Sequence, residues 1–131
     1  MPISNIVKKG EIPFDFTRER LSVIVEEESR YTLITKGAFS KVLNICTQVE
    51  RNKVIRDLDD VDLRNIQQLY ETWSSQGIRV LGISTRSVEL KEKYSIEDEN
   101  QMVFAGFLLL FDHPKQDVIQ TISNLEKNGV S

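Results

Sequence analysis

Short runs of β-branched and aromatic residues mark the first part of the chain as sheet. Residues 21–26 read Leu-Ser-Val-Ile-Val-Glu and residues 31–36 read Tyr-Thr-Leu-Ile-Thr-Lys. Such runs are typical of strands, and the polar turn between them predicts a hairpin. A second, smaller hairpin is predicted over residues 48–56, because the polar stretch at 51–53 interrupts two short runs.

Apolar residues three and four positions apart predict two helices. The first is short and covers residues 38–45. The second begins after Asp59 or Asp60, whose carboxylate would cap it, and Gly77 stands where a left-handed residue ends a helix. One face of this longer helix carries Leu63, Ile66, Tyr70 and Trp73.

The remaining pattern predicts two further strands and a last helix. The strands cover residues 78–85 and 102–111, the charged stretch 87–101 is a surface excursion, and the helix covers 118–127. Strands that neighbour each other in sequence and are joined by hairpins favour an antiparallel sheet over parallel βαβ units. The sequence therefore predicts an α+β fold, an antiparallel sheet flanked by helices.

Composition narrows the possible partners. The chain has 131 residues, enough for one domain, and a net charge of −3. This balance argues against nucleic acid or an anionic membrane as a partner, because both require a basic surface. The single Cys46 and the single His113 exclude an internal disulfide framework and a multi-histidine metal site. We interpret Cys46 as a core residue and His113 as a turn residue.

Three segments carry candidate chemistry. Phe14 and Phe16 are two apart in an extended segment, so their rings point the same way, and a ring at a cleft would stack on a flat heterocycle. Lys36-Gly37 would bring a positive charge and a close backbone approach to a ligand. Arg79, at the start of an apolar strand, would fork onto phosphate oxygens. Each also has a structural interpretation: core rings, a turn glycine and a strand-edge arginine.

The order of these segments carries a resemblance. They read Ile-Pro-Phe-Asp-Phe-Thr-Arg-Glu-Arg-Leu-Ser-Val-Ile-Val (12–25), Thr-Lys-Gly-Ala (35–38), Gln-Gly-Ile-Arg-Val-Leu (76–81) and Gly-Phe-Leu-Leu-Leu-Phe-Asp-His-Pro-Lys (106–115). Together they resemble the nucleotide-binding domain of P-type cation-transporting ATPases over about Lys9 to Gly129. The first segment looks closest to the bacterial magnesium-transporting branch of that family.

The resemblance implies an ATP site and a role for each residue. Phe14 falls on the phenylalanine that stacks on adenine, and Lys36 on the lysine of the Lys-Gly-Ala motif, deep in the pocket. Gly37 would line the pocket floor. Arg79 falls on the arginine that reaches the phosphates when the domains close. Magnesium would accompany the nucleotide in the full pump.

The resemblance also implies a division of the chain. Residues 1–111 would form the nucleotide-binding domain, and 112–131 the hinge and the start of the phosphorylation domain. The hinge falls on Asp112 and Pro114, with His113 in place of the first proline of the usual Asp-Pro-Pro. Glu19 stands where some pumps have a basic residue, so we expect Arg18 or Arg20 to supply that ATP contact.

The chain lacks the phosphorylated aspartate of the family in its Asp-Lys-Thr-Gly-Thr context. The resemblance therefore implies a cytoplasmic piece of a larger membrane pump, which would work with the remaining phosphorylation, actuator and membrane domains. Such a piece would position ATP without hydrolysing it alone.

Two other functions remain open at this point. The chain would be a non-catalytic protein-interaction domain if Phe14 and Phe16 belong to the core. It would be a phosphatase of the haloacid dehalogenase type if Asp57-Leu58-Asp59 formed the Asp-x-Asp nucleophile motif at a strand end.

Overall fold

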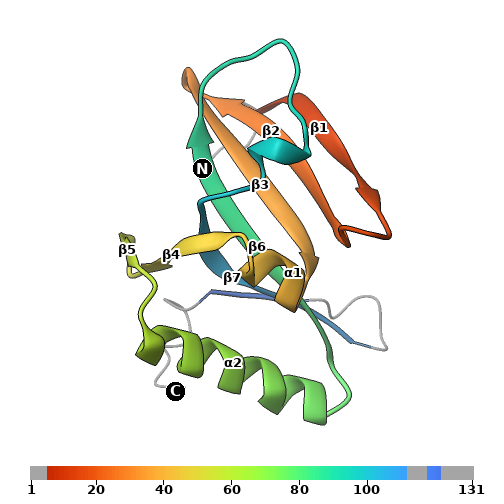
Figure 1. Ribbon diagram of the computed structural model, residues 1–131, viewed down its shortest axis with the longest axis vertical. Helices are drawn as coiled ribbons and strands as arrows, with labels where there is room; N and C mark the ends of the chain where they lie inside the picture. The colour runs from red at the N-terminus through yellow and green to blue at the C-terminus, as the bar shows by residue number, and fades with distance from the viewer. Residues whose placement is uncertain (1–5, 112–117, 122–131) are drawn as a thin grey trace.

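A single sheet is the framework of the fold (Figure 1). The computed structural model describes residues 6–111 and 118–121, and in them the sheet has eight strands. The strand order is β1-β2-β3-β6-β7-β4-β5, and β8 pairs with β7. All neighbouring strands are antiparallel except β4 and β7, which are parallel. The strands are β1 (Val7–Asp15), β2 (Arg20–Glu27), β3 (Arg30–Ala38), β4 (Cys46–Arg51), β5 (Val54–Asp57), β6 (Arg79–Val88), β7 (Met102–Leu110) and β8 (Val118–Thr121).

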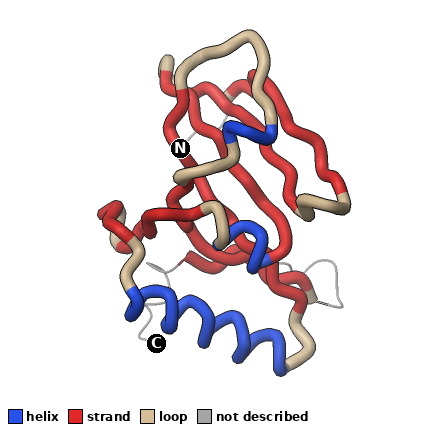
Figure 2. Tube along the Cα trace, viewed as in Figure 1, coloured by secondary structure: helices blue, strands red, loops and turns tan. Residues whose placement is uncertain are grey.

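The described residues also form two α-helices and a 3₁₀ turn: α1 (Phe39–Leu43), α2 (Asp60–Ser75) and η1 (Ile96–Asp98). The Asp59 side chain caps α2 by accepting a hydrogen bond from the backbone of Asp62. Gly77 follows the helix with φ of +82°, as the sequence predicts. In Figure 2, α2 runs across the lower end of the view, and α1 lies between it and the long strands.

Both predicted hairpins are confirmed. Their two-residue turns, Glu28-Ser29 and Asn52-Lys53, have φ between +52° and +65°. Turns with two left-handed central residues match the right-handed twist of the strands that they join. Local sequence is therefore enough to specify β2–β3 and β4–β5.

One face of the sheet is buried beneath the helices. A Cβ on Gly82 of β6 would lie 3.1 Å from the Cβ of Val42, so α1 packs directly on the sheet at this glycine. The main core includes fully buried Phe104 and Phe107, and Trp73 of α2 packs edge-on against Phe107. A second cluster lies beneath the 89–101 excursion and consists of Ile12, Ile24, Leu33, Tyr94 and Met102.

A polar row crosses the same face between the two apolar clusters. Ser22, Thr35 and Ser84 lie side by side on β2, β3 and β6, and all three are buried. The Ser22 and Thr35 hydroxyls are 2.7 Å apart and hydrogen-bonded. This row receives the buried carboxylate of Glu99 from the excursion.

The structure confirms the α+β class with its mostly antiparallel sheet and corrects one element. Residues 118–121 form strand β8, with Leu108 opposite Ile119, where the sequence predicts the start of a helix. Pairing with β7 overrides the helical spacing, and the β-branched pair Val118-Ile119 suits a strand. The rest of that predicted helix, and the hinge residues Asp112, His113, Pro114 and Lys115, lie outside the described residues.

Candidate functional site

The second face of the sheet carries Lys36. On β3 this residue lies opposite Leu21 of β2 and Ile83 of β6. Since side chains alternate along a strand, these residues face away from Ser22, Thr35 and Ser84. The aliphatic residues around Lys36 on this face are only half-buried; they are Leu21, Val23, Ile34, Leu81 and Ile83. The face therefore offers a partly open apolar surface around the Lys36 ammonium group.

Phe14 belongs to the same face. A bulge interrupts the β1–β2 register between Ile12, opposite Ser22, and Asp15, opposite Arg20. Asp15 shares the helix-covered face with Arg20, so counting back one residue from Asp15 places Phe14 on the opposite side with Leu21. Phe14 and Lys36 are two strands apart, which corresponds to a distance of ~10 Å across the sheet. The Phe14 side chain is 47% exposed and Phe16 is 89% exposed, with their rings edge to face at 5.5 Å. Neither ring belongs to the core.

Arg79 completes the set at the start of β6. It alternates in phase with Leu81 and Ile83, so it shares the face of Lys36, at ~14 Å from that residue by strand geometry. Within the described residues, neither the Lys36 ammonium nor the Arg79 guanidinium has a hydrogen-bond or ion-pair partner. Both cations are therefore available to an anion.

Gly37 has a packing role that the sequence analysis missed. A Cβ at this position would lie 2.2 Å from the Glu19 carbonyl oxygen and 2.8 Å from the Arg20 Cα. The position that a Gly37 side chain would occupy therefore lies against the backbone at the start of β2, on the helix-covered face and away from the side chain of Lys36. The Ala38 amide donates to the same Glu19 oxygen at 3.1 Å, so this segment holds β3 tightly against the β1–β2 turn.

Arg18 and Arg20 do not lie on the Lys36 face, and the expectation that one of them contacts ATP stays a prediction that this geometry does not favour. Both guanidinium groups pair with Glu99, at 2.7 Å and 3.1 Å, and their side chains are 7% and 13% exposed. Glu19 lies at the turn with φ of +54°, and its carboxylate approaches Lys41 at 3.9 Å. Sequence spacing alone did not show that these two arginines have an internal partner.

The phosphatase interpretation has no support in the geometry. Asp59 is the N-cap of α2. The pKa of its carboxyl is lowered, chiefly by the hydrogen bond from the Asp62 backbone; desolvation opposes this shift, and the positive charge of Arg56 adds to it. Asp57 ends the short exposed strand β5 at the margin of the sheet. Cys46 packs against both apolar clusters, as predicted, and burial raises the pKa of its thiol to about 12.

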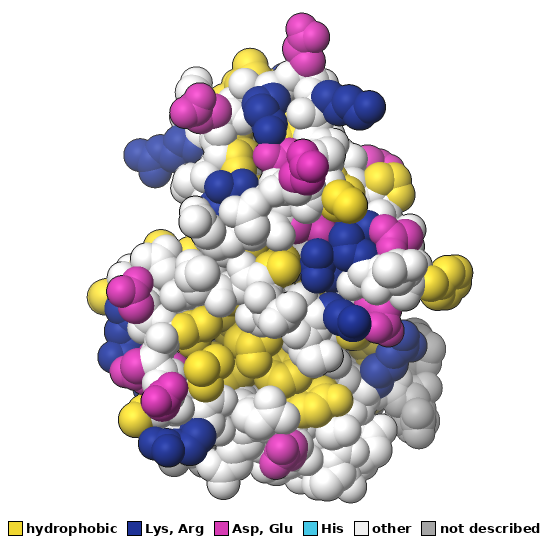
Figure 3. All heavy atoms as spheres, in the orientation of Figure 1, with side chains coloured by type: hydrophobic (Ala, Val, Ile, Leu, Met, Phe, Trp, Pro, Cys, Tyr) yellow, Lys and Arg dark blue, Asp and Glu magenta, His cyan; other side chains and the backbone are white. Residues whose placement is uncertain are grey.

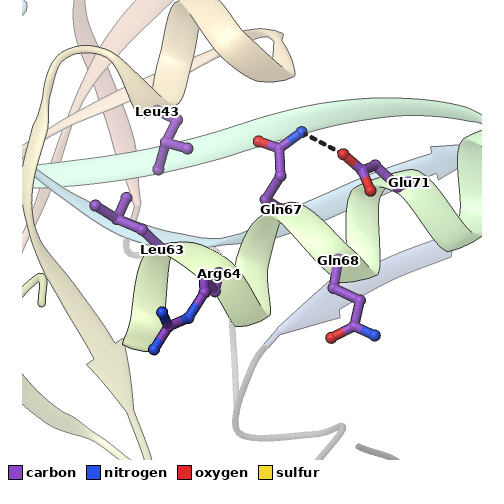
Figure 4. A pocket seen from close by; sticks show the side chains of 6 residues that line it. All are labelled: Leu43, Leu63, Arg64, Gln67, Gln68 and Glu71. Atoms are coloured by element: carbon purple, nitrogen blue, oxygen red, sulfur yellow. Dashed lines mark hydrogen bonds between the residues drawn. The ribbon is translucent and has the colours of Figure 1, made fainter. Parts of the chain in front are cut away.

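A separate hollow lies on the helix-covered side, between α1 and α2. Figure 3 shows apolar side chains gathered there in the lower half of the view. In Figure 4, Leu43 of α1 faces Leu63 of α2, and Gln67 donates to Glu71 at 3.2 Å. The hollow is lined by Leu43, Leu63, Arg64, Gln67, Gln68 and Glu71, and by none of the four predicted site residues. It is a second surface with a different chemistry.

Metal ligands are not gathered at either surface. Over residues 6–111 and 118–121, no three His, Cys, Asp or Glu side chains are grouped so that they could hold a metal ion. In the same ranges no helix has both the length and the hydropathy needed to cross a bilayer.

Comparison with known proteins assigns the family. The family model for "P-type ATPase, cytoplasmic domain N" matches residues 4–117. This chain belongs to that family. It is 36% identical over 126 residues to the magnesium-transporting ATPase, P-type 1, of Escherichia coli K12, and 37% identical over 126 residues to the protein of that name from Salmonella typhimurium 14028s. It is 28% identical over 121 residues to calcium-transporting ATPase 1 of Bacillus cereus ATCC 10987.

The matches cover nearly all of the chain and a small part of each relative. The alignments with the two magnesium-transporting ATPases take in 95% of this chain, and that with the calcium-transporting ATPase takes in 92%. They take in 14% of the length of each relative. The chain is thus a domain N similar to a segment of much longer P-type ATPases, among which the magnesium-transporting ones share more identity with it.

Proposed function

We propose that this chain binds ATP on the Lys36 face of its sheet and positions it within a P-type cation pump. The observation that carries the proposal is the shared face of Phe14, Lys36 and Arg79, on which both cations lack partners among the described residues. An exposed ring, an apolar surface and two free positive charges suit a ligand with a flat heterocycle at one end and phosphates at the other.

Each residue has one task in this proposal. The Phe14 ring stacks on adenine, and the half-buried Leu21 and Ile83 give the base an apolar bed. Lys36 adds a point charge near the ribose or the phosphates, and Arg79 neutralises phosphate charge at the end of the site. Gly37 contributes by packing, since it fixes the strand of Lys36 against β2.

The chemical step belongs to the rest of the pump. ATP supplies the phosphoryl group, which an aspartate on a neighbouring domain accepts, while this chain contributes positioning. Magnesium would arrive on the phosphates of the nucleotide, because the described residues offer no metal-ligand cluster. We accordingly propose that the chain alone binds ATP weakly and does not hydrolyse it.

The relatives also support a proposal for where the chain works. We propose that it works on the cytoplasmic side of a cell-membrane pump that transports magnesium, together with phosphorylation, actuator and membrane domains. The greater identity to the two magnesium-transporting ATPases than to the calcium-transporting one supports this choice of ion. Residues 1–111 would be the nucleotide-binding part and 112–131 the hinge and the start of the next domain.

Replacement of Phe14 by Ala tests the proposed stacking. We expect Phe14→Ala to weaken ATP binding at least about fivefold, because one aromatic stack on a base contributes ~1–3 kcal/mol. The measurement is an ATP titration followed by amide chemical shifts. Leu63→Ala is the matched control, since Leu63 is an apolar residue, 38% exposed, in the hollow on the other side of the sheet.

The result for Phe16→Ala distinguishes the two rings. If Phe14→Ala leaves ATP binding unchanged and Phe16→Ala weakens it, the more exposed Phe16 is the stacking ring and the assignment of Phe14 is wrong. If neither variant nor Lys36→Gln changes the titration, the nucleotide does not bind on this face.

A protein-interaction domain is the alternative function, and one observation favours it. The hollow between α1 and α2 gathers apolar side chains at the surface (Figure 3), as contact sites for other proteins do. A chain that binds no ATP at millimolar concentration would favour this alternative.

A further inference from the structure

The carboxylate of Glu99 is the most deeply buried charge in the described part of the chain to which the proposed ATP site gives no role. Its side chain is 0% exposed, and it reaches β2 from the 89–101 excursion. It accepts hydrogen bonds from Arg18 Nε at 2.7 Å, Arg20 Nε at 3.1 Å and Ser22 Oγ at 2.5 Å. A second nitrogen of Arg18, Nη2, lies 3.3 Å from its other oxygen.

Arg18 connects the Glu99 carboxylate to the end of β1 and to the β1–β2 turn, which carry Phe14 and Phe16 respectively. Its Nη2 donates to the carbonyl oxygen of Pro13 at 3.0 Å and to that of Arg20 at 2.7 Å. Its Nη1 pairs with the Asp15 carboxylate, which also accepts the Arg18 amide at 2.7 Å. One guanidinium therefore contacts the backbone on both sides of Phe14 and Phe16.

We propose that Glu99 is a positioning residue for the nucleotide site: through Arg18 it fixes the β1–β2 turn so that the aromatic ring stands ready for adenine. This inference rests on the proposed function. It gives the buried ion pair on one face of the sheet a role in the binding surface on the other.

The physical reason is that contacts of the two rings with the core do not determine their orientations. Phe16 is 89% exposed and Phe14 is 47% exposed, so their directions depend on the backbone of the turn. The Arg18 fork matches both the carboxylate and the two carbonyl oxygens, a planar geometry that lysine cannot reproduce. A ring held in place before binding avoids the entropy cost of ordering it in the complex.

The first test removes the charge of Glu99 with little change of shape. In the 131-residue chain, we expect Glu99→Gln to raise the Kd for ATP about tenfold, comparable to the cost of ordering one or two side chains. Lys91→Gln is the control: it breaks an exposed ion pair with Asp98 in the same excursion, and that pair does not contact the turn. Arg18→Lys, which keeps the charge and loses the fork, should weaken ATP binding as Glu99→Gln does.

A thermodynamic cycle separates positioning from general damage to the fold. If Glu99 acts through the ring, Glu99→Gln changes the Kd for ATP very little once Phe14→Ala and Phe16→Ala are both present. Equal weakening in both backgrounds would mean that Glu99 only maintains the fold, and it would overturn the inference. So would an unchanged Kd in both Glu99→Gln and Arg18→Lys.

A measurement without ATP keeps the inference separate from the proposed function. With fluorine-labelled phenylalanine, the Phe14 and Phe16 signals, assigned with the alanine variants, should broaden or move in Glu99→Gln and stay in place in Lys91→Gln. Absence of ATP binding by the wild-type chain would contradict the proposed function. Unchanged ring signals in a folded Glu99→Gln chain would overturn the role of Glu99.

Discussion

Lys36 and Glu99 are both charged, and their surroundings give them opposite roles. Glu99 is fully buried and bonded to Arg18, Arg20 and Ser22, so its charge is used inside the fold. Lys36 is half-buried with no partner among the described residues, so its charge remains available. A buried carboxylate without its arginines would be strongly destabilising, at roughly 3–5 kcal/mol for a broken buried pair.

Cys46 provides a test at the same scale. Burial raises the pKa of its thiol from 9.0 to about 12, so the folded chain holds very little thiolate at pH 8.5. We expect alkylation by iodoacetamide to be at least about a hundredfold slower in the folded chain than in urea, because the thiolate is the nucleophile. Comparable rates in both states would show that the thiol is accessible and ionises normally.

The same shift has a consequence for stability. Because the folded pKa is raised, the contribution of Cys46 is fully present below pH 9.0 and is lost as the pH rises towards 12. The free energy of unfolding of Cys46→Ala should therefore fall less between pH 9.0 and about 12 than that of the wild-type chain.

The sequence pointed to Phe14, Lys36 and Arg79 mainly through the resemblance of their segments to a known family, and their role in ATP binding stays a prediction. The internal contacts that support these segments could not be predicted. The partnership of Arg18 with Glu99 joins residues 81 positions apart, through an excursion that has no regular pattern. The packing role of Gly37 could not be predicted either, because it depends on how closely the backbone at the start of β2 approaches this glycine.

At the scale of elements, α2 shows how local chemistry fixes a boundary. Asp59 caps the helix, and the Asp62 side chain completes the capping box while pairing with Arg56 at 2.6 Å. The cap therefore defines the helix start, and the ion pair connects that start to β5.

The Asp59 cap should make the free energy of unfolding depend on pH in the acidic range. The folded pKa of Asp59 is lowered, chiefly by hydrogen bonds from the Asp62 backbone, so its contribution is present above pH 3.8 and is lost as the pH falls through the folded pKa. We expect Asp59→Asn, which retains a capping oxygen, to lose less stability than wild type below pH 3.8.

Urea unfolding between pH 2.5 and 6 would measure this difference, taking ~0.5-unit steps around the ordinary carboxyl range. Asp60→Asn serves as the control, because the exposed Asp60 is the first helical residue and does not cap. Parallel acid curves for wild type and Asp59→Asn would contradict the assigned cap.

Elements made by local signals were predictable, and those made by distant partners were not. The two hairpins and α2 follow from turn residues, a cap and helical spacing. Strand β8 forms where the spacing indicates a helix, because pairing of Leu108 with Ile119 extends the sheet. Strand β1 contains charged residues and a proline, and was expected only as an extended segment; its partner β2 makes it a strand.

At the scale of the whole molecule, the sheet separates two surfaces. The helix-covered face holds the core, the Glu99 ion pairs and the α1–α2 hollow (Figures 2 and 4). The other face carries the open apolar strands with Lys36 and Arg79. In the proposed function, this second face is the one that binds the nucleotide.

The most direct test of this account maps ATP onto the two faces. Amide chemical shifts of the 131-residue chain are followed during titration with millimolar ATP, and guanosine triphosphate serves as the comparison for the base. We expect the largest changes at Leu21, Lys36 and Ile83, with little change at Leu43 and Leu63. The account would be contradicted if no shifts occurred, or if they were confined to the hollow between α1 and α2.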